Sequence, residues 1–179
     1  RAARLTRVDR KYVLDARGAA DLMERLPEGS LALEIDGLRT FGYDSVYLDT
    51  PRLDAFRATV TRRRHRFKVR TRRYTDSDLT FLEVKTRRGS FTVKERIGHA
   101  SMTDLGAGES FVAEALERAG VRVDVAQLAP TLTVSYRRST LVLPAGTYPL
   151  TQSLVLLEGI TLSGAGRDAT VLKAAAPDA

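Results

Sequence analysis

The stretch FKVRTRRY at residues 67–74 decides the fold. Side chains two positions apart on a β-strand point to the same side of the sheet. Lys68, Arg70 and Arg72 therefore share one basic face, and the apolar residues between them share the other. The stretch predicts a strand with one face in a core and the other face carrying positive charge that no neighbouring acid neutralises.

Other segments repeat this alternation, so strands are expected to dominate. In 80–86, Glu83 and Lys85 lie opposite two apolar residues, and in 91–97, Lys94 and Arg96 do the same. The remaining segments that alternate with period two are 6–14, 43–49 and 131–142.

Two segments have the apolar spacing of helices, 15–26 and 108–119. Asp15 is the expected N-cap of the first, and Gly120 the expected C′ residue of the second. The apolar stripes predict that both helices cover a sheet.

The basic face has two interpretations. It could be the solvated side of an ordinary antiparallel sheet, which alternates for the same reason. Against this, like charges directly opposite on neighbouring strands destabilise a sheet. If the sheet instead curls into a tunnel with this face inward, the rows of Arg and Lys converge on one axis, where a linear polyanion fits.

The amino-acid composition restricts the classes of molecule that the chain is expected to bind. The chain has 179 residues, a net charge of +7 and a pI near 10.0, which favours polyanions. Nine Arg or Lys and no acid lie between Phe56 and Thr75. With no cysteine, thiolate chemistry is excluded and a cytoplasmic location is expected. The longest apolar stretch is too short to span a bilayer.

Six motifs in order resemble one known family. They are DRKY (9–12), YLDT (47–50), FKVRTRRY (67–74), LEVKT (82–86), VKER (93–96) and PTLTVSYRR (130–138). Together they resemble the VTC domain of polyphosphate polymerases, a relative of the CYTH-like triphosphate tunnel metalloenzymes. The resemblance implies an α+β fold, an antiparallel β-tunnel with a few covering helices, over residues 1–143.

The resemblance also implies a function. ATP would donate its γ-phosphate to a growing polyphosphate chain, with a divalent metal, Mn or Mg, as cofactor. Tunnel residues that would contact phosphate and support transfer are Lys11, Arg70, Arg72, Lys85, Lys94 and Arg138. Lys68 and Arg96 would be further phosphate ligands, and Tyr136 could line the tunnel or belong to the core.

The chain departs from the family after Leu143. The family's later strands, including the acidic one that binds metal, are not recognisable, so we expect an incomplete tunnel in a fragment of a longer protein and name no metal ligand. Residues 144–179 carry a net charge of −1 and form a predicted β-rich appendage. It resembles the first coil of a pectate-lyase-like β-helix, or it consists of edge strands that patch the tunnel.

Three functions remain open. The first is polyphosphate synthesis, and the second is a non-catalytic module that binds polyphosphate or inositol pyrophosphate. The third, nucleic-acid binding, is disfavoured because Phe67 lies opposite the basic face, where it cannot stack on bases. Neither the oligomeric state nor the phosphate acceptor follows from the sequence.

Overall fold

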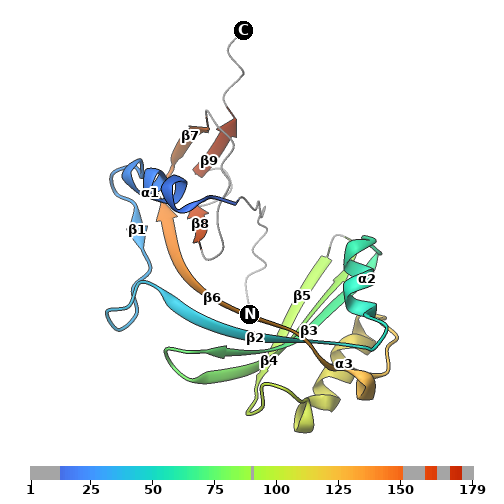
Figure 1. Ribbon diagram of the computed structural model, residues 1–179. Coiled ribbons are helices and arrows are strands. Elements are labelled where there is room, and N and C mark those ends of the chain that lie inside the picture. Colours follow the sequence, from blue (N-terminus) through green and yellow to red (C-terminus); the bar gives the residue numbers. More distant parts are fainter. Residues whose placement is uncertain (1–12, 90, 151–159, 165–169, 175–179) are drawn as a thin grey trace. The chain divides into compact units, whose positions relative to one another are not determined.

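The computed structural model describes residues 13–89, 91–150, 160–164 and 170–174 (Figure 1). Its helices are α1 (Ala16–Glu24), α2 (Asp54–Val60) and α3 (Glu109–Arg118). Its strands are β1 (Leu31–Ala32), β2 (Phe41–Asp49), β3 (His65–Tyr74), β4 (Leu79–Arg88), β5 (Phe91–Gly98), β6 (Ala129–Leu143), β7 (Gly146–Leu150), β8 (Ile160–Gly164) and β9 (Thr170–Ala174). The chain divides into two compact units, residues 42–136 and residues 1–41 with 137–179.

The main sheet has the strand order β1-β6-β2-β3-β4-β5. The β2–β3, β3–β4 and β4–β5 pairs are antiparallel, which confirms the predicted α+β class with an antiparallel sheet. Within the described residues, β5 has a neighbour on one side only, so these strands leave the sheet open at β5.

The core of unit 42–136 lies between the sheet and α3. Phe67, Val69, Leu82 and Val84 are buried from the sheet side, and they meet a cluster that includes Val112, Ala115 and Leu116 of α3. The alternation of β3 and β4 therefore places one face in the core, as the sequence predicted. The opposite face carries the basic residues.

Helix α3 confirms the prediction for 108–119. Gly120 follows it with φ +66°, a left-handed conformation that glycine adopts without strain. At the other end, a Cβ on Gly108 would collide with the side chain of Leu82, so glycine allows α3 to start directly against β4.

Helix α1 also forms where it was predicted, and Asp15 caps it by accepting a hydrogen bond from the Gly18 backbone NH at 2.7 Å. No residue of α1 is buried, however. The prediction that the apolar stripe covers a sheet is confirmed for α3 and stays a prediction for α1, where Ala19, Leu22 and Leu26 are of intermediate burial.

Helix α2 was not predicted from the sequence. Its seven residues are too few for a clear apolar period, and an aspartate on the preceding strand holds its start. Asp49 accepts from the backbone NH of Thr50 (2.8 Å), Ala55 (2.9 Å) and Phe56 (2.9 Å). The Asp49 carboxylate is thus committed to capping a helix.

The C-terminal strands pair in parallel. β6 pairs with β8 from Ser139↔Ile160 onward, and β7 pairs with β9 from Gly146↔Thr170 onward. Each strand thus pairs with the strand two later in the chain, as stacked coils of a β-helix require. The domain boundary at 143/144 stays a prediction, and the strand predicted over 6–14 lies almost wholly outside the described residues.

No helix among the described residues is long and apolar enough to cross a bilayer.

Candidate functional site

The polar face of β2–β5 gathers the basic residues predicted from the sequence. The strand registers set Lys68, Lys85 and Lys94 side by side in one row. The next row consists of Tyr47, Arg70, Glu83 and Arg96, and the row after it of Ser45, Arg72 and Phe81. We call this surface the basic face.

A buried carboxylate lies in the middle of the basic face. The Glu83 side chain is 2% exposed and holds two cations. Its Oε2 lies 2.6 Å from Nη2 and 2.8 Å from Nε of Arg70, and its Oε1 lies 2.6 Å from Nζ of Lys94. Nη1 of Arg70 donates to the Tyr47 hydroxyl at 3.0 Å, so all three guanidinium nitrogens of Arg70 are engaged.

The two cations decide the ionisation of Glu83. Burial alone would raise the pKa of this carboxyl, but hydrogen bonds and charge from Lys94 and Arg70 outweigh burial and hold the pKa below its ordinary value. Glu83 is therefore ionised at neutral pH, and it neutralises part of the basic face before any ligand arrives.

Arg72 is held differently. Its Nε donates to the Ser45 hydroxyl at 3.0 Å, and its guanidinium carbon lies 5.3 Å from the Tyr43 ring centroid and 5.6 Å from that of Tyr136. The two rings are stacked with centroids 5.1 Å apart. No acid pairs with Arg72 in the part of the chain that the structure describes, and its terminal nitrogens make no hydrogen bond there. The Ser45 contact and the two rings fix a guanidinium fork that remains available for an anion.

The lysine row adds further positive charge to the basic face. Lys68, Lys85 and Lys94 are all exposed, and Lys94 pairs with Glu83. The three side chains stand on neighbouring strands, so an anion bound across the row would meet positive charge from each strand, part of which Glu83 already neutralises. At the β5 edge of the sheet, the guanidinium carbon of Arg96 lies 4.7 Å from the centroid of the Phe81 ring.

The site thus unites six of the eight predicted phosphate ligands. Lys11 lies outside the described residues. Arg138 belongs to the other compact unit, and its buried Nε has no hydrogen-bond partner among the described residues. Tyr136 contributes to the basic face through the Arg72 stack.

Sequence reasoning missed Tyr43 and Ser45 as anchors of Arg72. Only cross-strand register identifies them, since Ser45 lies opposite Arg72. The alternation of 43–49 could have placed both residues on the face of Tyr47.

The described residues do not fit a metal ion. They contain no group of three or more His, Asp or Glu that could hold one. Both oxygens of Glu83, the carboxylate best placed among the phosphate ligands, are taken by cations.

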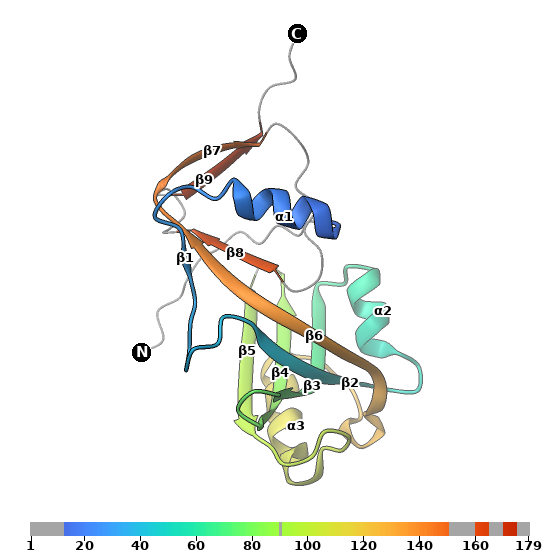
Figure 2. The ribbon, with the colours of Figure 1, turned by 60° about the vertical axis from the view of Figure 1, so that its left-hand side comes forward.

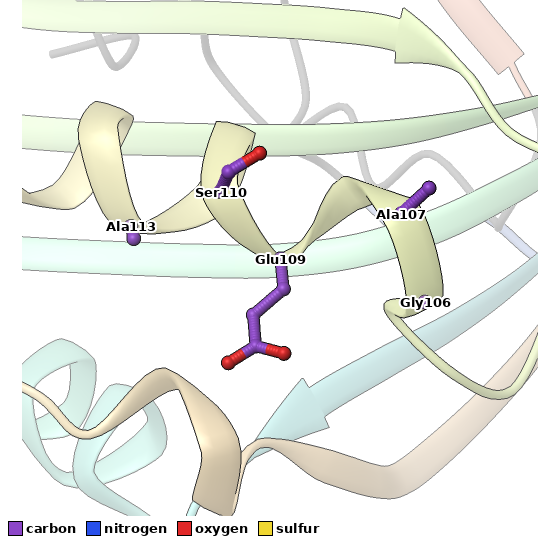
Figure 3. Close-up of a pocket in the computed structure, with 5 residues that line it drawn as sticks. All are labelled: Gly106, Ala107, Glu109, Ser110 and Ala113. Atoms are coloured by element: carbon purple, nitrogen blue, oxygen red, sulfur yellow. The ribbon is translucent and has the colours of Figure 1, made fainter.

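A shallow depression elsewhere is not part of this site. It lies along the start of α3, as Figure 3 shows, and is lined by Gly106, Ala107, Glu109, Ser110 and Ala113. Its one charged lining residue is Glu109, which would repel a polyanion. The helix covers the apolar side of the sheet, so the depression does not open on the basic face.

Fold and site together define a class, an antiparallel β-sheet domain whose polar face is lined with Arg and Lys. The VTC domain family model matches residues 6–150, and the chain belongs to this family. Curated proteins gave no match.

Two solved structures are similar at low identity. One is a protein of Bacillus halodurans described as a candidate adenylate cyclase, with 14% identity and a TM-score of 0.48 over 72% of this chain and 63% of that one. The other, from Vibrio parahaemolyticus and described in the same way, has 10% identity and a TM-score of 0.40 over 73% and 59%. The chain therefore spans less than two thirds of the length of either structure.

Proposed function

We propose that the basic face binds a chain of phosphates, such as polyphosphate or tripolyphosphate. The observation that carries the proposal is Arg72, whose guanidinium is fixed by Ser45 and two tyrosine rings while its terminal nitrogens stay unpaired among the described residues. A fixed fork matches two phosphate oxygens and loses little side-chain entropy on binding. The lysine row lies on the same face, beyond the row of Arg70 and Glu83, and supplies charge for further phosphates of a linear chain.

Transfer of the γ-phosphate of ATP to polyphosphate is the finer form of this proposal, and it rests on family membership. Phosphoryl transfer depends mainly on positioning and on neutralising the charge of the transferred group. Arg72, Lys85 and Lys94 would serve this purpose here, joined by Arg70, Lys11 and Arg138. The nucleophile would be a terminal phosphate oxygen of the growing chain.

A non-catalytic phosphate-chain module is the second candidate. It is favoured by the state of Glu83, whose two oxygens are engaged by Arg70 and Lys94 and therefore cannot serve a metal in this arrangement. Such a module needs the basic face but no metal.

Binding should be strongly salt-dependent. Each Lys or Arg that contacts a polyanion releases counterions, so we expect the affinity for tripolyphosphate to fall steeply as salt is raised. Isothermal titration calorimetry over a series of salt concentrations measures this slope. An affinity that is independent of salt, or no binding at low ionic strength, would refute the proposed function.

Synthesis from ATP should be weak or absent with residues 1–179 alone. The described residues lack a metal site, and each lost contact to developing charge costs on the order of 10²–10³ in rate. Incubation with ATP and Mn²⁺, followed by gel detection of polyphosphate, tests this expectation. Robust synthesis would contradict the binding-module candidate and favour the polymerase.

A further inference from the structure

A second basic surface lies outside the basic face, around α2 and the loop that follows it. Helix α2 buries Ala55 and Ala58 and turns Phe56 and Val60 outward, where they are 60% and 61% exposed. These two side chains are four residues apart and therefore lie side by side on one helix face. Large apolar side chains exposed together mark a surface that contacts something else.

A third apolar side chain lies at the same end of this unit. Phe91, 68% exposed, starts β5 directly after the β4–β5 turn and pairs with Arg88. The Gly89 backbone NH donates to the Arg64 carbonyl at 3.0 Å, which ties that turn to the loop after α2. Figures 1 and 2 both show α2 at the end of the sheet where β4 ends and β5 begins. Phe56, Val60 and Phe91 with Arg57, Arg62 and Arg63 form what we call the α2 surface.

The charge of the α2 surface is one-sided. Arg57, Arg62 and Arg63 are exposed, and no acid occurs between residues 56 and 75. The nearest preceding acid, Asp54, accepts a hydrogen bond from the Thr50 hydroxyl at 2.7 Å and lies 3.9 Å from the Arg52 guanidinium. It does not neutralise the loop arginines.

We propose that the α2 surface docks on an anionic lipid bilayer. Exposed apolar side chains beside Arg are the combination that binds such a surface, because the side chains enter the interface while the cations meet acidic headgroups. Phosphate-chain binding at the basic face does not require this contact. A nucleic acid fits less well, because Val60 offers no ring for stacking on bases.

Vesicle co-sedimentation tests the proposal with the full chain. We expect binding to vesicles of phosphatidylcholine and phosphatidylserine in equal amounts, and none to phosphatidylcholine alone. The double variant Phe56→Ser/Val60→Ser should weaken binding by about tenfold or more, since it removes two apolar anchors. Arg62→Ala/Arg63→Ala should have an effect of about the same size.

Matched controls distinguish binding through the α2 surface from nonspecific adsorption to vesicles. Leu79 is 55% exposed at the far end of the same hairpin, so Leu79→Ser removes a similar apolar side chain and should leave binding unchanged. Arg72→Ala should also leave it unchanged. If Arg72→Ala abolishes vesicle binding while Phe56→Ser/Val60→Ser does not, headgroups enter the basic face and the proposal is wrong.

A spectroscopic readout does not depend on affinity. The chain has no tryptophan, so Phe91→Trp introduces a single reporter. Its emission should shift to the blue on anionic vesicles and be quenched by brominated lipid, whereas a Leu79→Trp reporter should not respond. An unshifted emission from the Phe91→Trp variant on vesicles that do bind the protein overturns the proposal. So does binding of single-stranded RNA that depends on Phe56 and Val60 while vesicles are ignored.

Discussion

Replacing Arg72 with alanine should weaken tripolyphosphate binding strongly. Hydrogen bonds to charged groups contribute about 1.5–3 kcal/mol, so the dissociation constant should rise roughly 10- to 100-fold. Arg72 is 8% exposed and held by Ser45 and the Tyr43–Tyr136 stack, so its fork is in place before the ligand arrives. Arg72→Lys keeps the charge but loses the fork, and it should recover only part of the affinity.

Three arginines serve as controls for Arg72. Arg73 is the next residue on β3 but pairs with Asp44 at 3.0 Å on the other side of the strand. Arg62 and Arg63 lie exposed in the loop after α2. Exposed charges contribute about 0–1 kcal/mol, so alanine at any of these positions should change affinity less than about fivefold. If calorimetry shows equal losses for all four arginines, the ligand senses only a diffuse basic surface and the fixed fork is irrelevant.

Glu83→Gln should destabilise the fold and tighten phosphate binding at the same time. Removing one partner of a fully buried ion pair costs about 3–5 kcal/mol. The Arg70 side chain is 20% exposed and that of Lys94 is 45% exposed, so water can solvate both cations in part when Glu83 is neutral. We therefore expect Glu83→Gln to lower the free energy of unfolding by about 2 kcal/mol. Because the variant also removes a negative charge from the basic face, affinity for tripolyphosphate should rise by about tenfold.

The stability effect should depend on pH. The pKa of Glu83 is lowered in the folded state, so its ionised form stabilises the protein above the ordinary value of 4.5. That stabilisation is lost as pH falls below 4.5 and through the folded-state pKa, and the difference between wild type and Glu83→Gln should shrink accordingly. Urea unfolding at several pH values measures it.

Glu95→Gln is the matched control for Glu83. Glu95 lies on the neighbouring strand β5 but pairs with exposed Arg118 at 2.8 Å on the helix side of the sheet. We expect Glu95→Gln to lower the free energy of unfolding by less than about 1 kcal/mol and to leave the affinity for tripolyphosphate unchanged. If Glu83→Gln instead weakens tripolyphosphate binding, Glu83 serves to hold Arg70 and Lys94 in position for the ligand. That result would refute the prediction that Glu83 competes with the ligand for these two cations.

The sequence by itself determined the two faces of the sheet and the identity of the basic residues on one of them. Strand alternation has a fixed period of two, so residues 67–74 and 80–86 could be assigned to core or basic face without coordinates. The order of six motifs was enough to indicate the family. Helix α3 was also predictable, because its apolar stripe and Gly120 are local signals.

Only the tertiary structure decided which cations are already paired. Arg70 and Arg72 are two positions apart and look equivalent in the sequence, yet one is bound to Glu83 and the other is stacked on tyrosines. That difference comes from cross-strand register, which joins residues such as Ser45 and Arg72 that are far apart in the chain. Local patterns carry no information about such pairings, and for the same reason the capping of α2 by Asp49 was not foreseen.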